Sequence, residues 1–372
     1  MPGMIGWRPR RRDVLAAALT TPFARASQAF RGEVAAGRVG ALAAQKGILF
    51  GAACLIRDVS VDPIYAALLA RECRVLVAQN ELKWAALRPA PELFDFNGAD
   101  GVLAFAERIG ARMRGHTLVW HEALPKWCAR EINARTGFPL LAEHIAAVCG
   151  RYRGRLHSWD VVNEAVEPED GRADGLRETP WLRALGPSYI AEAFRMAAAA
   201  DPSALLVYND YGVCDAGRKA SAKRVAVLRL LDRLAAEGAP VHALGMQAHL
   251  TTGMRITERD LRGFLDEVAE RGMQVMITEL DVLDEKAAPE APYAQDARVS
   301  DVYRAFLEVV LAHPATTACI TWGLSDRYSW LRAAEGRKDS WALRPLPFDD
   351  NHLPKAAWLA IAVAMGESKV RN

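Results

Sequence analysis

Two glutamates in this chain each end a short run of apolar, β-branched residues: Glu164 in "WDVVNEA" and Glu279 in "VMITELDV". Such runs suit strands that are buried on both faces, so each carboxylate is expected where a strand leaves the packed interior. Paired carboxyl groups that flank a bound sugar hydrolyse glycosidic bonds. A separation near about 5 Å gives retention through a covalent glycosyl-enzyme, and a gap near about 8 Å gives inversion. The pair therefore predicts glycoside hydrolysis, provided that the fold brings the two side chains together.

Neighbouring residues give Glu279 the expected role of nucleophile. Side chains alternate between the two faces of a strand, so Glu279 and Asp281 share one face of their run. Gln247 and His249 share one face of the preceding run for the same reason. His249 can then lie between Glu279 and Asp281, where it would hold the carboxylate of Glu279 ionised and correctly aimed.

Glu164 has a different setting, because it follows Asn163 and would face the charge of Glu279. A nearby negative charge favours the protonated form of a carboxyl group, so Glu164 is the expected general acid. Once Glu279 is esterified its charge disappears, and Glu164 can lose its proton and act as the base for water. Asn163 is placed to bind the sugar hydroxyl next to the anomeric carbon.

Polar and aromatic side chains follow the other apolar runs as well. A single such residue is usually a helix cap or a solvated loop residue. If all of these polar side chains gathered at one opening of the fold, burying each unpaired group would cost on the order of a few kcal/mol. Binding a ligand would explain such a set, and flat aromatic faces complement pyranose rings. We therefore expect a sugar-binding mouth. Its polar candidates are Asn80, Lys83, His121, Asn209, Asp210, Ser325 and Asp326, and its aromatic candidates are Trp84, Trp120, Tyr211, Trp322, Tyr328 and Trp330.

The elements that must position these residues alternate along the chain. After residue 46, eight short apolar runs are separated by longer amphipathic stretches, which indicates βαβ units with parallel pairing. Eight units match a single-domain α/β fold, the (β/α)8 TIM barrel, whose chemistry collects at the carboxyl ends of the strands. A doubly wound open sheet is the alternative, but no GxGxxG follows the first run. The runs span residues 47–54, 74–82, 111–121, 155–164, 204–212, 242–250, 274–282 and 317–326.

Composition excludes several classes of protein. The 372 residues are 51% hydrophobic and 25% charged with a net charge of +2, which is ordinary for a soluble globular chain. No basic stripe interleaved with aromatics suggests nucleic acid, and no apolar run approaches the roughly 18 residues that span a membrane. The six cysteines lie far apart and are expected to be small buried hydrophobes, although one disulfide would be compatible with export. We expect a monomer without metal or other cofactor.

The N-terminus predicts an export signal over residues 1–26. It contains an arginine-rich stretch with the pair Arg11 and Arg12, a short apolar segment and a small-residue cleavage site ending at Ala26. The pair of arginines resembles a twin-arginine signal, so we expect a periplasmic or extracellular protein. A basic amphipathic tail is the alternative interpretation. Residues 27–372 would form the catalytic barrel.

Taken together, the quoted runs resemble glycoside hydrolase family 10, chiefly endo-β-1,4-xylanases. The matching stretches occur in the family's order from about residue 45 to 365, among them "NELKW", "GHTLVWH", "YNDYG", "GMQAHL" and "ITWGLSDRYSWL". The resemblance implies a (β/α)8 barrel and net retention without a metal, with Glu164 as acid/base and Glu279 as nucleophile. The sugar-binding positions that it implies are Asn80, Lys83, His116, His121, Asn163, Gln247, His249, Trp322 and Trp330; Trp120 and Tyr211 are added as candidates from their places at strand ends.

One position departs from the family pattern. Gln79 stands where the family usually has a glutamate, and it can bind a sugar only as a neutral amide. The expected function is retaining endo-1,4-β-xylanase activity on xylan or xylo-oligosaccharides, with a β-1,4-glucanase or broad β-glycosidase as the alternative. A non-catalytic glycan-binding protein would have little reason to keep both glutamates. A metal-dependent barrel hydrolase would need an HxH motif on the first strand, and that run has none.

Overall fold

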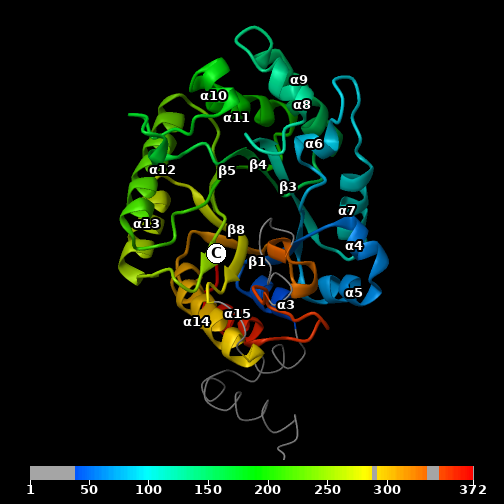
Figure 1. The fold of residues 1–372 in the computed structure, drawn as a ribbon, viewed down its shortest axis with the longest axis vertical. Helices are drawn as coiled ribbons and strands as arrows, with labels where there is room; N and C mark the ends of the chain where they lie inside the picture. Colours follow the sequence, from blue (N-terminus) through cyan, green and yellow to red (C-terminus); the bar gives the residue numbers. More distant parts are fainter. Residues whose placement is uncertain (1–37, 287–290, 333–342, 372) are drawn as a thin grey trace, which may run out of the picture.

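Nine parallel strands form one sheet at the centre of the molecule (Figure 1). The computed structural model describes residues 38–286, 291–332 and 343–371, so the predicted export signal lies outside the described residues. The strands are short and buried along nearly their whole length, as expected for β-branched runs covered on both faces. They are β1 (Leu49–Cys54), β2 (Val75–Ala78), β3 (Arg112–Val119), β4 (Ser158–Asn163), β5 (Leu205–Asp210), β6 (Ala243–Met246), β7 (His249–Thr251), β8 (Gln274–Leu283) and β9 (Thr316–Thr321).

Eight of these strands close into a ring. β1 pairs with both β2 and β9, and β6 pairs with both β5 and β8, so no open edge remains among the eight. The predicted (β/α)8 barrel is therefore confirmed. The run predicted as one strand over 242–250 is divided into β6 and β7, because Ala248 between them adopts a left-handed backbone with φ 61°. β7 pairs with the outer part of β8 and extends the barrel at its mouth.

Helices follow the strands and cover the barrel from outside (Figure 1). Several begin at side-chain caps: Asp62 accepts from the backbone N–H groups of Ile64 and Tyr65, and Thr257 accepts from that of Asp260. The helices are α3 (Val39–Gln45), α4 (Ile56–Val61), α5 (Pro63–Glu72), α6 (Trp84–Leu87), α7 (Asn97–Arg108), α8 (Lys126–Glu131), α9 (Gly137–Tyr152), α10 (Pro180–Leu185), α11 (Ser188–Ala200), α12 (Arg218–Ala236), α13 (Glu258–Glu270), α14 (Pro292–Val310) and α15 (Ala356–Glu367), with 3-10 turns η2 (Pro168–Asp170), η3 (Asp326–Tyr328) and η4 (Trp330–Arg332).

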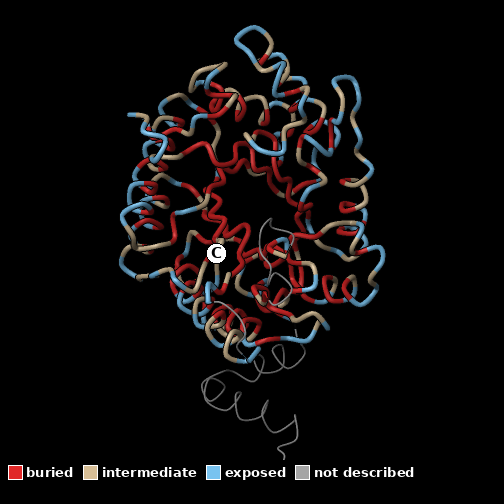
Figure 2. The backbone as a smooth tube through the Cα atoms, viewed as in Figure 1, coloured by how far each residue is buried: buried red, intermediate tan, exposed pale blue. Residues whose placement is uncertain are grey.

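The core has an outer and an inner part. The outer part lies between strands and helices, and Figure 2 shows buried backbone in the central ring and exposed segments mainly at the periphery. The inner part is a smaller apolar cluster inside the barrel that includes Val75, Val77, Val207 and Met276. All six cysteines lie within the described residues and are buried and unpaired, which agrees with their expected role as small hydrophobes.

Backbone irregularities occur beside both predicted catalytic positions. The pairing of β4 with β5 shifts register between Asp160 and Val162, and that of β8 with β9 shifts between Ile277 and Leu280. A shift of one residue changes which side chains face inward. Residues before each shift therefore alternate regularly and fill the barrel with packed side chains. Residues after the shift, towards the carboxyl end of the strand, can point into the mouth.

Gly115 on β3 allows close contact with the neighbouring strand. It lies opposite Trp159, and a Cβ atom at position 115 would lie 2.1 Å from the buried Trp159 ring. Gly115→Ala should therefore lower the free energy of unfolding by about 1–3 kcal/mol in denaturant titrations. Gly263→Ala is the matched control, since its Cβ on α13 would have no neighbour within 4 Å and should stabilise by about 0.5–1 kcal/mol. Equal effects of the two variants would contradict this packing account.

Candidate active site

The two glutamates share one buried network of side-chain amides. Asn209 at the end of β5 donates through Nδ2 to Glu279 Oε1 at 2.8 Å and to Asn163 Oδ1 at 2.9 Å. Asn163 Nδ2 is 3.1 Å from Glu164 Oε1, and Gln247 Nε2 donates to the same oxygen at 2.9 Å. The two carboxyl groups therefore lie at the same mouth of the barrel and are connected through two asparagines.

Glu164 is aimed into this mouth by its backbone. It follows β4 with φ 59°, a left-handed conformation that costs a non-glycine residue on the order of 1 kcal/mol or more and that is concentrated at functional sites. Trp120 Nε1 donates to its Oε2 at 2.9 Å, and Arg177 Nε donates to its backbone carbonyl at 2.9 Å. Indole, amide and guanidinium groups thus fix both the side chain and the main chain of Glu164.

Glu279 lies against His249, which in turn contacts Asp281. His249 Nε2 is 3.2 Å from Glu279 Oε2, and Nδ1 is 2.9 Å from Asp281 Oδ1. Trp330 Nε1 donates to the other Asp281 oxygen at 2.7 Å. The structure places His249 between the two carboxylates, in the arrangement that strand alternation predicts.

Neighbouring opposite charges determine the protonation states of Glu279 and His249. Burial alone would raise the pKa of Glu279, but His116, His249 and Lys83 outweigh it and lower the pKa to about 2. Burial likewise acts to lower the pKa of His249, whereas Asp281 and Glu279 raise it to about 10. At neutral pH an ionised Glu279 therefore faces a protonated imidazole, which is the state a carboxylate nucleophile needs.

Buried charges inside the barrel support His116, and sequence reasoning missed them. Asp160 on β4 accepts two hydrogen bonds from the Arg114 guanidinium, and its Oδ2 is 2.9 Å from His116 Nδ1. His116 Nδ1 also lies 3.9 Å from Glu279 Oε1. Both runs contain further charged residues, Arg112 and Arg155 among them, so the sequence gives no sign that Arg114 pairs with Asp160. Arg177 was missed as well, because it lies in a loop with no periodic pattern.

A cavity of about 540 Å³ adjoins the Glu279 side of the mouth. Lys83 Nζ donates to Asn80 Oδ1 at 2.9 Å and lies over the rings of Trp120 and Trp322, with 5.2 and 5.9 Å to their centroids. Burial lowers the pKa of Lys83, and the charges of Glu279 and Glu164 partly offset that effect. The lining residues are Leu55, Arg57, Asp58, Gln79, Asn80, Lys83, Trp322, Arg327, Tyr328, Ser329, Trp330 and Arg332.

A second cavity of about 430 Å³ adjoins the Glu164 side and includes Tyr211 in its lining. Arg177 connects the two, since its Nη2 donates to the Tyr211 hydroxyl at 2.7 Å while its Nε binds the Glu164 carbonyl. Lys223 Nζ lies 3.7 Å from the Tyr211 ring centroid. Neither glutamate lines a cavity itself: Trp330 connects the first cavity to Asp281 beside Glu279, and Arg177 connects the second to Glu164.

Several of the predicted residues differ from those described above. Ser325 and Asp326 are fully buried and contact the Asp349 carbonyl and Lys355, so the expectation that they offer polar groups to sugars is wrong. His121 forms no hydrogen bond to the network within the described residues; burial lowers its pKa, and the charge of Glu164 acts in the opposite direction. The expectation that Trp84 offers a ring to sugars is wrong. It is 2% exposed, stacks on His144 with 3.6 Å between ring centroids, and donates to the Leu118 carbonyl, so it belongs to the core. Its place just after a strand gave no sign of this packing. Among the described residues, no group of three or more His, Cys, Asp or Glu side chains could hold a metal ion.

Known proteins resemble this chain over nearly the whole barrel. A sequence profile described as glycosyl hydrolase family 10 matches residues 39–364. A β-1,4-xylanase of Dictyoglomus thermophilum is 35% identical over 312 residues, which cover 80% of this chain and 83% of that protein. Endo-1,4-β-xylanase B of Thermotoga neapolitana is 33% identical over 304 residues, with 82% and 84% covered. Among solved structures, xylanase 10B of Thermotoga petrophila RKU-1 in complex with xylobiose has a TM-score of 0.80 at 32% identity and covers 88% of this chain and 97% of that one.

The protonation of His249 generates a pH prediction. Because its pKa rises from 6.5 to about 10 on folding, His249 contributes stability that is complete below pH 6.5 and is lost as the pH rises to about 10. Asp281→Asn removes the negative charge that contributes most to raising the pKa of His249. An NMR titration of the variant should therefore find that the His249 imidazole loses its proton at a lower pH. The difference in free energy of unfolding between wild type and variant should narrow as the pH increases over this range. An unchanged titration of His249 in the variant would contradict the assignment.

Proposed function

Because the chain belongs to glycosyl hydrolase family 10, we propose that Glu279 and Glu164 are the nucleophile and the acid/base with which it hydrolyses internal β-1,4-xylosidic bonds in xylan. The chain is an endo-1,4-β-xylanase with a retaining mechanism, and its substrate is a xylo-oligosaccharide or polymer. The observation that carries the residue assignment is the network through Asn209 and Asn163, which joins the two carboxyl groups at one mouth.

In the first step a carboxylate oxygen of Glu279 attacks the anomeric carbon, and Glu164 gives its proton to the departing glycosidic oxygen. The bond between the anomeric carbon and that oxygen breaks while the glycosyl ester forms. Ionisation of Glu279 beside protonated His249 supplies the attacking lone pair. Asn163 is proposed to bind the hydroxyl next to the reacting carbon, where a hydrogen bond can strengthen as the charge of the ring changes.

In the second step water attacks the same carbon from the side that the leaving group vacated. Glu164, now unprotonated and no longer opposite a charge, takes a proton from the water, and the ester bond to Glu279 breaks. Two inversions at one carbon give net retention. The Glu279 carboxylate is then ionised again beside His249, which keeps its contact with Asp281.

The two cavities define how the sugar chain lies. The covalently held part, or glycone, stays on Glu279, so the cavity with Gln79, Asn80, Lys83, Trp322 and Trp330 is assigned to it. The departing part, or aglycone, receives the proton of Glu164, so the cavity with Tyr211 is assigned to that part. Trp120 borders the reacting bond through its contact with Glu164, and His116, His121 and Gln247 complete the proposed binding residues.

The remaining assignments concern the whole chain. We propose that residues 1–26 are a twin-arginine type export signal, that residues 27–372 form the catalytic barrel, and that the protein acts as a periplasmic or extracellular monomer. The arginine pair and the apolar segment of the N-terminus support the export signal. Among the described residues, no helix is long and apolar enough to cross a membrane.

The roles of the two glutamates can be separated by chemical rescue. Glu279→Ala should lower kcat/KM on xylan by roughly 10³-fold or more, because no covalent intermediate can form. Azide should restore turnover of an activated aryl xylobioside and give an α-glycosyl azide. Glu164→Ala with azide should give the β-product, since Glu279 still forms its ester. Glu270→Ala, at an exposed helix end, is the control; an active Glu279→Ala variant without azide would refute the mechanism.

Gln79 generates a prediction on glycone binding. A carboxylate accepts hydrogen bonds from sugar hydroxyls about twice as strongly as a neutral amide does. Gln79→Glu should therefore lower KM for neutral xylo-oligosaccharides by about threefold or more in steady-state kinetics. Gln274→Glu, at the start of β8 and the opposite end of the barrel, is the matched control. No change of affinity in Gln79→Glu would count against a role of this residue in binding.

A further inference from the structure

The glycone cavity carries an excess of positive charge. Gln79 adds no charge to its lining, and only one carboxylate faces the cavity among the residues that line it. A site for neutral sugars needs hydroxyl partners and aromatic faces, not several cations. The charged lining residues are Arg57, Lys83, Arg327 and Arg332, against Asp58.

Two of these four cations are committed to other contacts. Lys83 donates to Asn80 and faces two indole rings, and Arg332 pairs with Asp350 at 2.8 Å. Arg57 is different: its side chain is 79% exposed, and its Nε lies 3.2 Å from the neighbouring Asp58, a surface pair of little energetic weight. Arg327 has no ion-pair partner within the described residues, and its guanidinium lies 6.0 Å from the Tyr328 ring centroid. Arg57 and Arg327 are therefore available for a ligand.

The barrel brings these two arginines to the same side of the mouth. Arg57 lies on α4, directly after β1, and Arg327 lies on η3, directly after β9. β1 and β9 are neighbouring parallel strands, with Ala52 opposite Thr321 near their carboxyl ends. A guanidinium group binds a carboxylate through two parallel hydrogen bonds, so a pair of them at one edge of a sugar cavity matches an acidic substituent.

We propose that Arg57 and Arg327 bind the carboxylate of a uronic acid side group on the glycone part of xylan, so that the enzyme prefers acidic over neutral xylan. The inference rests on the proposed function, because the assignment of this cavity to the glycone follows from Glu279 as nucleophile. It adds a class of preferred substrate and two specificity-determining residues to that function.

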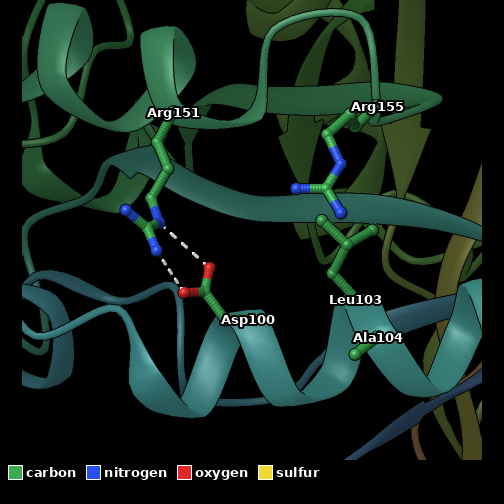
Figure 3. Close-up of a pocket in the computed structure, with 5 residues that line it drawn as sticks. All are labelled: Asp100, Leu103, Ala104, Arg151 and Arg155. Carbon is green, nitrogen blue, oxygen red and sulfur yellow. Dashed lines mark hydrogen bonds and ion pairs between the residues drawn. The ribbon is translucent and has the colours of Figure 1, made fainter.

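Two other cavities of similar size lack this excess of positive charge. A cavity of about 450 Å³ between α7 and α9 also contains two arginines, but Figure 3 shows Arg151 paired with Asp100, and Arg155 pairs with Glu107 at 2.8 Å. The aglycone cavity has three cations in its lining, including Arg218, but also the carboxylates of Glu167 and Glu169. Of these three cavities, the one on the glycone side has the largest excess of cations.

The test compares two substrates that differ at one group: a xylo-oligosaccharide with one glucuronic acid side group and the same compound with its carboxyl group reduced to an uncharged alcohol. Wild type should show kcat/KM about tenfold higher on the acidic compound, with about threefold from each arginine. This ratio should fall as sodium chloride is raised, because salt screens exposed charges. The double variant Arg57→Gln/Arg327→Gln should bring the ratio close to one.

Controls separate the alternatives. Arg153→Gln removes an exposed arginine beyond the opposite end of β4 and should leave the ratio unchanged. A ratio near one in wild type, with both compounds cleaved, would overturn the preference and leave the xylanase function intact. Loss of the ratio in Arg218→Gln but not in the double variant would also overturn it, because the carboxylate would then bind on the aglycone side. If wild type cleaves neither compound nor linear xylan, the proposed function itself fails. Should the double variant unfold, Arg327→Gln alone must still lower the ratio about threefold.

Discussion

The active site depends on keeping one carboxylate charged while removing it from water. Glu279 is only 4% exposed, and a buried carboxylate is unstable in its ionised form unless cations and hydrogen-bond donors compensate it. His249 supplies the positive charge, Asn209 supplies a second donor, and Asp281 keeps His249 protonated. These groups come from β5, β7 and β8, so the compensation is assembled by the fold and does not exist in any single segment.

Departures from regular strand geometry let the barrel serve both packing and chemistry. A regular strand presents alternate residues to the interior, where they must fill space. The shift next to Val162 and the left-handed backbone of Glu164 turn side chains of β4 into the mouth. The left-handed Ala248 divides the sixth barrel strand, so that Gln247 contacts Glu164 while His249 contacts Glu279. Local strain thus has a function, since it directs two neighbouring residues to different partners.

The eight-fold repeat predicts the barrel, and alternation along the run 274–282 predicts that Glu279 and Asp281 share one face. The left-handed Ala248 that divides the preceding run could not be predicted, because the run has no turn residue there. The ion pair of Arg114 with Asp160 could not be predicted, since it joins two strands whose register the sequence does not state. The same limit applies to Asn209, which was recognised as a polar strand end but not as the link between the glutamates. Trp84 shows the converse: its place after a strand is ordinary for a site residue, and only tertiary packing removes it from the surface.

The pairing of β1 with β9 joins residues that are very distant along the chain; the Thr321 hydroxyl donates to the Gly51 carbonyl across 270 positions. Such long-range contacts make folding slow, because the chain loses the entropy of closing a long loop before the packing contacts between the two strands can stabilise it. Trp322 follows β9 directly, and Arg57 on α4 and Arg327 on η3 also follow these two strands. Truncated or partly translated chains consequently lack a substrate groove, whatever secondary structure they contain. Hydrolytic turnover can thus serve as a stringent readout of complete ring closure in expression or chaperone studies.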